Sequence, residues 1–367
     1  MNAARALEVA DDLDTPVAVR DDAAMERNLV RMAGIALGAS VRLRPHAKTH
    51  KSQEVARRQI EHGAVGLTVA TLREAEVFAE SGVRDILIAH PPVGRPKLAR
   101  LAHLVGRLDR LAVSLDDVEL ARAVPPGVEI LWEVDTGLHR VGTPAGDATV
   151  AAVVRLVAAI GRPRFRGLLT HGGHAYKATN PDQRQRAAAE ESQGLVETAR
   201  LLSAAGVEVR EVSVGSSPTA EFAAEFSGVT EIRPGTYVYG DAGQVALGSH
   251  ALADCALGVV ASVISAPAPD RCVLDCGSKS ISADRPASSL TGYGLVLGHP
   301  DLAVARLSEE HAVLTAAAGH FTGLEVGDRV VVIPSHACTT VNLHAHLLSF
   351  GVDGEVTWEA VSARGWR

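Results

Sequence analysis

The chain has 367 residues, of which 47% are hydrophobic and 22% charged, and its net charge is −7. These proportions exclude a disordered or fibrous chain. The acidic balance argues against a nucleic-acid partner, because non-specific binding needs a basic face. No apolar run reaches the ~18 residues of a membrane span, and the first residues form no apolar signal segment, so we expect no membrane association. Only four cysteines occur, which favours a reducing, cytoplasmic location over a disulfide scaffold.

Strand-like and helical segments alternate between residues 20 and 242. Amphipathic patterns at 52–63 and 182–206 indicate two of the helices. Such alternation predicts βαβ units, and eight strands in ~200 residues predict a (β/α)8 TIM-type barrel. A doubly wound open sheet is the alternative. The eight strand-like runs are 41–46, 66–70, 85–90, 110–115, 128–134, 165–171, 209–215 and 230–240.

The pattern changes after residue 242. Short strand-like runs at 273–282, 306–316 and 328–337, separated by Gly, Pro and Asp, predict a second, all-β domain over 243–367. The segment 15–21 also reads as a strand, and it precedes the barrel. We therefore expect residues 1–19 and 243–367 to form one discontinuous β domain beside a barrel of residues 20–242.

Polar residues follow five of the expected barrel strands, whereas the strand starts carry few. Because the carboxyl ends of barrel strands share one face, these side chains are expected to form a site there. Lys48 follows the first strand, Arg140 the fifth and Tyr176 the sixth. The last two strands end near Gly215, Ser216, Ser217, Arg233, Gly235 and Thr236.

Two of these segments suit a phosphorylated aldehyde cofactor. Gly215, Ser216 and Ser217 form a turn whose N–H groups and hydroxyls suit a phosphate, although a plain helix cap by either serine is an alternative. Gly235 would let a second backbone segment approach the same phosphate. The Lys48 amine suits a Schiff base, although a solvated loop lysine is the alternative. Together they indicate pyridoxal 5′-phosphate.

His336 and Cys338 lie two positions apart in the second domain. On a strand, such positions share one face, so imidazole and thiolate would hold one metal and leave positions open for water or substrate. The alternative is a buried cysteine with an unrelated histidine.

These motifs resemble the fold-type III pyridoxal phosphate enzymes, the alanine-racemase-like barrel group, and within it the D-serine dehydratase and D-threonine aldolase family. The resemblance covers the chain from about Thr15 onward. It rests on RPHAKTHKS, VGSSPT and IRPGTYVYGD in the barrel, and on LDCGSKSISAD, EEHAVL and PSHACTTVNLH in the second domain.

The resemblance implies that Lys48 carries the cofactor, that Arg140 lies near its phenolic oxygen and that Tyr176 lies near its pyridine nitrogen. It also implies a homodimer with the active site at the interface. Cys338, rather than Asp, favours zinc over manganese or magnesium, since thiolate is a soft ligand.

We therefore expect a pyridoxal phosphate- and zinc-dependent lyase for small D-β-hydroxy-α-amino acids, with D-serine or D-threonine dehydration to a 2-keto acid and ammonia as the first choice. Retro-aldol cleavage to glycine and an aldehyde is the alternative. A racemase and a non-enzymatic cofactor-binding regulator are weaker alternatives, because neither needs the metal pair.

Overall fold

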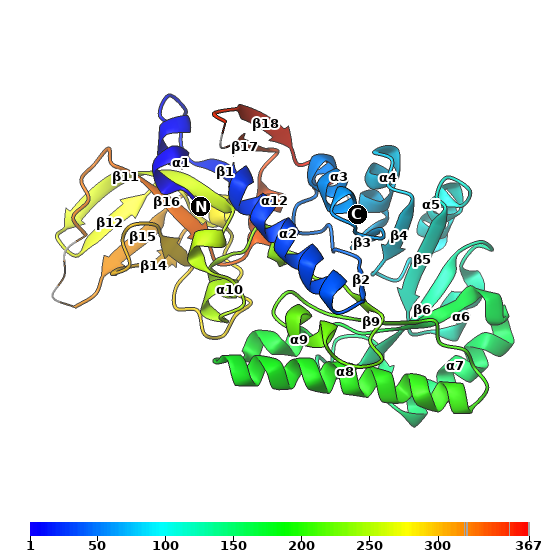
Figure 1. Cartoon of the computed structure of the whole chain (residues 1–367). Helices are drawn as coiled ribbons and strands as arrows, with labels where there is room; N and C mark the ends of the chain where they lie inside the picture. Colours follow the sequence, from blue (N-terminus) through cyan, green and yellow to red (C-terminus); the bar gives the residue numbers. More distant parts are fainter. Residues whose placement is uncertain (319, 321, 352, 366–367) are drawn as a thin grey trace.

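A computed structural model describes residues 1–318, 320, 322–351 and 353–365. The chain forms two lobes, one of parallel strands with helices around them and one mostly of antiparallel strands, with a long helix running between them (Figure 1). The predicted barrel with a second β domain is confirmed.

Eight parallel strands form the barrel. Their order is β2 (Arg42–Leu43), β10 (Glu231–Ile232), β9 (Glu211–Val214), β8 (Phe165–Leu169), β6 (Glu129–Asp135), β5 (Arg110–Leu115), β4 (Asp85–Ile88) and β3 (Leu67–Val69), and β7 (Thr143–Pro144) pairs with β6. Hydrogen bonds from Val65 N to Leu43 O (2.9 Å) and from Thr68 N to Pro45 O (2.8 Å) join the segments of β2 and β3. This junction closes the barrel and excludes an open sheet.

Helices follow the barrel strands. They are α2 (Asp22–Gly38), α3 (Gln53–Glu61), α4 (Leu72–Glu80), α5 (Arg95–Leu104), α6 (Val118–Ala123), α7 (Asp147–Ile160), α8 (Pro181–Ala204) and α9 (Ala220–Ala224). Side chains cap several of them: Ser52 accepts from Val55 N at α3, and Asn180 accepts from Gln183 N ahead of Pro181 at α8. Unlike these, α5 has no side-chain cap and no acidic residue in its first turn.

The second lobe is built on a nine-stranded sheet. Its strand order is β12 (Arg271–Leu274), β15 (Ala312–Ala316), β14 (Leu302–Leu307), β13 (Gly294–Val296), β16 (Arg329–Pro334), β11 (Leu257–Ala268), β1 (Val17–Asp21), β17 (His346–Phe350) and β18 (Val356–Ala360). β12 also pairs with β11, which closes part of this sheet. β1 lies antiparallel to β11 and parallel to β17, as expected for the strand at 15–21. The domain limits at residues 19–20 and 242–243 stay a prediction.

Helices also occur in this lobe: α1 (Ala3–Val9), α10 (Ala242–Ala246), α11 (Ser278–Ile281) and α12 (Ala337–Leu343). The expectation of a strand through residues 273–282 is wrong beyond Leu274. At Gly277 the backbone passes so close to the loop between β14 and β15 that an added Cβ would lie 2.3 Å from Glu309 O. This close approach ends the sheet pairing, and the chain turns into α11.

The strand starts of the barrel carry many charges, so the expectation of few polar groups there is wrong. Arg44 binds Glu231 (2.9 Å) and Asp85 (2.6 Å), and Arg110 binds Glu211 (2.8 Å). Arg44 and both glutamates are buried. The amino-terminal end of the barrel is therefore closed by a network of paired ions.

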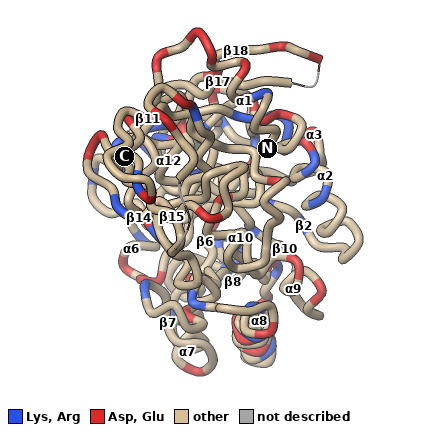
Figure 2. Tube along the Cα trace, turned by 90° about the vertical axis from the view of Figure 1, so that its left-hand side faces the viewer, with Lys and Arg blue, Asp and Glu red and all other residues tan. Residues whose placement is uncertain are grey.

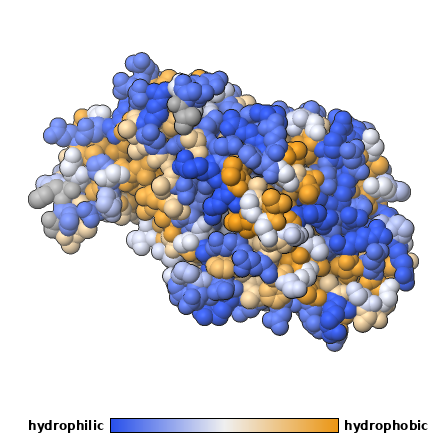
Figure 3. Space-filling view, viewed as in Figure 1, coloured by the Kyte–Doolittle hydropathy of each residue, from blue (hydrophilic) through white to orange (hydrophobic). Residues whose placement is uncertain are grey.

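Hydrophobic atoms reach the surface over and beside α2 (Figure 3), where Leu37 is 81% exposed. In the described part of the chain, no helix is both long enough and apolar enough to cross a membrane.

Candidate active site

One cavity of about 160 Å³ at the carboxyl end of the barrel is lined by every residue that the sequence singled out for cofactor or metal binding. Its walls come from the ends of the barrel strands and from the second lobe. These residues are Lys48, Arg140, Tyr176, Gly215, Ser216, Ser217, Arg233, Gly235, Thr236, His336 and Cys338. Their roles stay predictions, but the chain brings them together.

Lys48 lies in a turn directly after β2. Within the described residues its amine forms no hydrogen bond or ion pair. Lys51, three positions on, is different: its amine donates to Asn342 Oδ1 (2.8 Å) and pairs with Glu74 (3.3 Å). Of these two lysines, Lys48 is therefore the one whose amine is free to react.

The turn after β9 differs from the expected phosphate cradle in one respect. Gly215, with φ +122°, donates its N–H to the buried Glu191 (2.7 Å) rather than into the cavity. Ser217 Oγ accepts from Gly235 N (3.1 Å) and Tyr237 N (3.0 Å), so its own proton remains to be donated.

The remaining donors of this cradle are the Ser217 hydroxyl and the backbone N–H groups of Ser217 and Thr236, since the Thr236 hydroxyl lies 3.6 Å from Cys338 Sγ. Those two N–H groups have no acceptor in the described residues. Neutral donors of this kind fit a phosphate dianion.

Arg233 and Tyr176 line the cavity through different contacts. Buried Arg233 donates to Ser213 Oγ (2.6 Å) and to Thr170 O, which fixes its guanidinium across the barrel interior. Burial lowers the pKa of Arg233 from its usual value. The Tyr176 hydroxyl accepts from Gln244 (3.3 Å), and burial raises its pKa above the usual range, so the phenol stays neutral.

Two histidines in the cavity are uncharged. Burial, and then the nearby Lys48, lower the pKa of His171 to about 3. His171 Nδ1 lies 3.2 Å from Gly215 O, which requires a proton on Nδ1 and leaves Nε2 as an acceptor. Burial also holds the pKa of His46 well below its usual range, with Lys48 adding to the effect. Neutral imidazoles do not add positive charge beside the Lys48 amine.

His336 and Cys338 meet at the cavity, but not on a strand as expected. β16 ends at Pro334, His336 precedes α12 and Cys338 lies in its first turn. The helix, not a strand face, places them together. His336 Nδ1 lies 2.6 Å from Asp284 Oδ2, so Nε2 is left for a metal.

The thiol is suited to metal binding. Burial alone would raise the pKa of Cys338, but His336 lowers it to about 7, which favours the thiolate. Although burial opposes a charge on His336, Cys338 and Asp284 raise its pKa to about 10. In the described residues no group of three His, Cys, Asp or Glu side chains is arranged to hold a metal, so this pair would leave coordination positions open.

Sequence reasoning missed four residues at or beside this site. Glu133 and Pro286 line the cavity, Asp284 orients His336, and Glu191 holds Gly215. Two of the four carried a signal: Asp284 ends the motif LDCGSKSISAD, and Glu133 is a carboxylate flanked by apolar residues within β6. Burial raises the pKa of Glu133 although Ser114 donates to it (2.5 Å).

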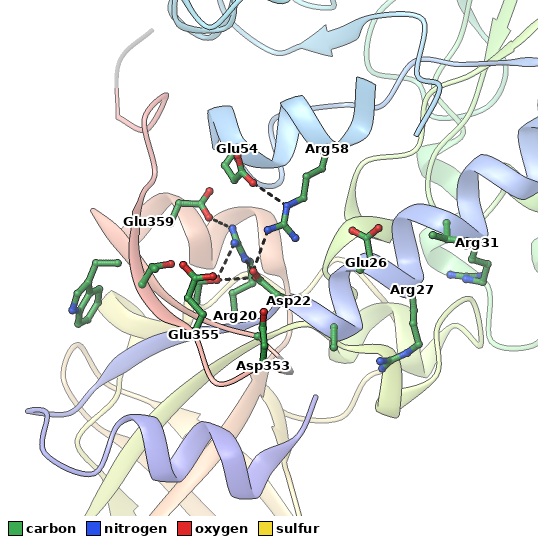
Figure 4. A pocket seen from close by; sticks show the side chains of 16 residues that line it. Arg20, Asp22, Glu26, Arg27, Arg31, Glu54, Arg58, Asp353, Glu355 and Glu359 are labelled. Atoms are coloured by element: carbon green, nitrogen blue, oxygen red, sulfur yellow. Dashed lines mark hydrogen bonds and ion pairs between the residues drawn. The ribbon is translucent and has the colours of Figure 1, made fainter. Parts of the chain in front are cut away.

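A larger cavity, of about 950 Å³, lies elsewhere, between α2, α3 and the β17–β18 hairpin (Figure 4). The hairpin carries the acidic residues Asp353, Glu355 and Glu359 (Figures 2 and 4), and two arginines of the cavity wall, Arg20 and Arg58, are paired. Arg20 binds Asp22 (2.7 Å) and also Glu359, and Arg58 binds Glu54 (3.0 Å). The contact between Arg20 and Glu359 joins β1 to β18, and Arg58 also pairs with Asp22 (3.3 Å), which joins α3 to α2.

Comparison with known proteins shows the family of this chain. Residues 21–243 match the family model "Alanine racemase, N-terminal domain", and residues 256–350 match "Putative serine dehydratase domain". The chain is 36% identical to D-threo-3-hydroxyaspartate dehydratase of Delftia sp. (strain HT23), covering 96% of this chain and 98% of that one. It is 33% identical to D-threonine aldolase of Arthrobacter sp (96% and 93%) and 28% identical to D-serine dehydratase of Dictyostelium discoideum (94% and 95%).

Solved structures give the same result. The Delftia dehydratase has a TM-score of 0.88 at 36% identity, covering 97% of this chain and 99% of that one. D-threonine aldolase of Filomicrobium marinum has a TM-score of 0.86 at 31% identity, covering 96% of each chain. Alanine racemase of Clostridium difficile 630, at 13% identity and a TM-score of 0.64, shares the fold alone. The chain belongs to the alanine-racemase-like family of lyases that includes D-serine dehydratases and D-threonine aldolases.

Proposed function

We propose that this chain is a pyridoxal phosphate- and metal-dependent lyase that dehydrates small D-β-hydroxy-α-amino acids to a 2-keto acid and ammonia. One observation carries the proposal. A free lysine amine, a cradle of neutral donors and an imidazole–thiolate pair line one cavity, and the two lobes contribute to it together.

The residues that line the cavity fit both pyridoxal phosphate and a metal ion. Ser217 and Thr236 would hold the phosphate, Lys48 the aldehyde carbon, Tyr176 the ring nitrogen and Arg140 the phenolic oxygen. His336 and Cys338 would hold the metal, and a thiolate ligand favours zinc. When bound, the cofactor would supply an electron sink at the substrate Cα and the metal a Lewis acid at its β-hydroxyl.

The chain's own residues have defined tasks in this proposal. The Lys48 amine, free of protein partners, takes the proton from Cα. The neutral Tyr176 phenol would donate a hydrogen bond to the ring nitrogen without adding charge. Glu191 keeps Gly215 in place behind the phosphate, and Asp284 holds the His336 ring with Nε2 toward the cavity.

A Delftia relative supports the metal pair. Structures of that enzyme include a cysteine-to-alanine variant in a metal-free form and a histidine-to-alanine variant, and the two substituted residues lie two positions apart. His336 and Cys338 have the same spacing. The homodimer, with a second chain closing the site, stays a prediction that sedimentation of the holoenzyme tests.

Retro-aldol cleavage is the second candidate, favoured by the similarity to the two D-threonine aldolases. Product analysis distinguishes dehydration from retro-aldol cleavage. The protein is reconstituted with pyridoxal phosphate and zinc and incubated with D-serine, D-threonine and threo-3-hydroxy-D-aspartate. Ammonia and a 2-keto acid support dehydration. Glycine and an aldehyde would establish the aldolase, and racemisation unaffected by chelation would overturn both.

A further inference from the structure

One hydroxyl of the barrel reaches the candidate metal pair of the second lobe. Thr49 follows Lys48 in the turn after β2, and its Oγ1 lies 3.1 Å from Cys338 Sγ in the first turn of α12. The same turn touches α12 a second time, since the Lys51 amine donates to Asn342 Oδ1 (2.8 Å). The turn that carries Lys48 and the helix that carries Cys338 are therefore in direct contact.

The Thr49 side chain is fully buried, and its hydroxyl has little freedom to bond elsewhere. Its exposed fraction is 0%, and within the described residues the hydroxyl has no other hydrogen-bond partner. The segment after β10 passes directly over it, because a Cβ added at Gly235 would lie 3.0 Å from Thr49 Oγ1. Thr236, the next residue of that segment, has its own hydroxyl 3.6 Å from Cys338 Sγ. Thr49 is thus the nearer of two hydroxyls at this sulfur.

The charge on the sulfur decides what the Thr49 hydroxyl contributes. Burying a hydroxyl without a good partner costs free energy, and a neutral thiol is a weak acceptor. Valine has nearly the shape of threonine and would fill this space without that cost. A thiolate that binds a metal carries no proton, so Thr49 must be the donor to it, and hydrogen bonds to charged acceptors are among the stronger ones. The buried hydroxyl therefore suits a metal-bound thiolate better than it suits a thiol.

We propose that Thr49 is a positioning residue for the metal, because its hydroxyl donates to the Cys338 thiolate and holds the sulfur at the cavity. This inference rests on the proposed function, in which His336 and Cys338 hold the metal. Asp284 orients the other ligand, since it lies 2.6 Å from His336 Nδ1. Each ligand would then have its own supporting contact, as metal ligands in proteins usually have. Because Thr49 adjoins Lys48, the barrel itself would fix the sulfur relative to the reactive amine.

Zinc affinity of the protein loaded with pyridoxal phosphate, measured by competition with a chromogenic chelator, tests the proposal without an activity assay. Thr49→Val removes the hydroxyl and keeps the bulk of the side chain. The Kd for zinc should rise about 10- to 100-fold, the usual cost of losing such a supporting contact. Thr49→Ser keeps the hydroxyl and should restore most of the affinity, whereas Thr49→Ala should behave like Thr49→Val. The absorbance band of the bound cofactor should match that of the wild type in all three variants.

Cobalt(II) in place of zinc gives a second readout, at the sulfur itself. A hydrogen bond lowers the energy of the sulfur lone pairs, so its loss makes charge transfer from sulfur to cobalt easier. The sulfur-to-cobalt charge-transfer band should therefore move to longer wavelength in Thr49→Val and stay at the wild-type position in Thr49→Ser. A threonine that only filled space would leave this band unchanged in both variants.

Thr68→Val is the matched control. Thr68 is also fully buried in the barrel, but its hydroxyl donates to Arg44 O (3.3 Å) and it does not line the cavity. This variant should keep the zinc affinity and the cobalt band of the wild type.

Three results would overturn the role of Thr49 while leaving the lyase intact. They are wild-type zinc affinity in Thr49→Val, equal losses of affinity in Thr49→Val and Thr68→Val, and failure of Thr49→Ser to restore the affinity. If Cys338→Ala bound zinc as tightly as the wild type, the proposed metal site itself would be overturned instead.

Discussion

The two ends of the barrel are both rich in charge, but they use it differently. At the amino-terminal end, Arg44 binds Glu231 and Asp85, and Arg110 binds Glu129 (2.6 Å). At the carboxyl end, the side chain of Lys48 has no such partner in the described residues.

The difference shows that charge alone does not mark a binding site. Buried ions that satisfy one another close the bottom of the barrel, and the charged cavity beside α2 is built in the same way. Desolvated or partly buried cations without partners cost stability unless something binds them. The carboxyl end of the barrel is therefore where a phosphorylated cofactor would be held.

The largest effect is expected for Lys48→Ala. Loss of the reactive amine should reduce kcat by at least about 10³-fold, the scale of a lost general base. The partly buried Lys48 side chain has no hydrogen-bond or ion-pair partner in the described residues, so thermal unfolding should be nearly unchanged. Lys51→Ala is the control, since it removes a paired lysine. If Lys51→Ala abolished activity and Lys48→Ala did not, the assignment of the two lysines would be reversed.

Arg44→Ala tests whether the ion network at the amino-terminal end of the barrel is structural. Removing one partner from a buried ion network should lower the free energy of unfolding by about 3–5 kcal/mol. Denaturant titration measures this change, and kcat/KM of the folded protein should stay close to that of the wild type. Arg57→Ala, which removes an exposed pair with Glu54 and Glu61, should cost less than about 1 kcal/mol. Equal losses in the two variants would show that the network is not structural.

Chelation should lower turnover about 10²-fold or more, since a Lewis acid contributes several kcal/mol at the leaving hydroxyl. The cofactor absorbance should remain, because the barrel groups that would hold it do not include His336 or Cys338. Added zinc should restore the wild type but not Cys338→Ala. Full activity after complete metal removal would contradict the metal role.

The smallest effect is expected for Ser217→Ala. It removes one hydroxyl donor, so the Kd for pyridoxal phosphate should rise about fivefold, equivalent to about 1 kcal/mol. Ser216→Ala is the control, since the Ser216 hydroxyl already bonds within the protein, 3.0 Å from Thr219 Oγ1. A larger rise in Kd for Ser216→Ala than for Ser217→Ala would show that Ser216, and not Ser217, donates to the phosphate.

The sequence predicted which residues lie together because parallel strands impose a shared end on residues far apart in the chain. Strand count and strand order follow from local patterns, so Lys48, Ser217 and Gly235 could be expected together. Contacts between side chains on separate elements could not be predicted from local patterns. Glu191 reaches Gly215 from the middle of α8, and Asp284 reaches His336 across 52 residues.

The helix at His336 was missed for a related reason. A short β-branched run next to Pro334 looks like a continuing strand, and only the packing of α12 in the second lobe decides otherwise. The ion network at the strand starts was also missed, because single charges at separate strand starts do not reveal that they meet.

The central claim is that the carboxyl end of the barrel holds the cofactor through one lysine. Borohydride reduction of the reconstituted wild-type protein, followed by peptide mapping, tests it most directly. The account predicts one adduct per chain, on Lys48. An adduct on Lys51, on Lys97 or on a lysine outside this cavity would contradict it.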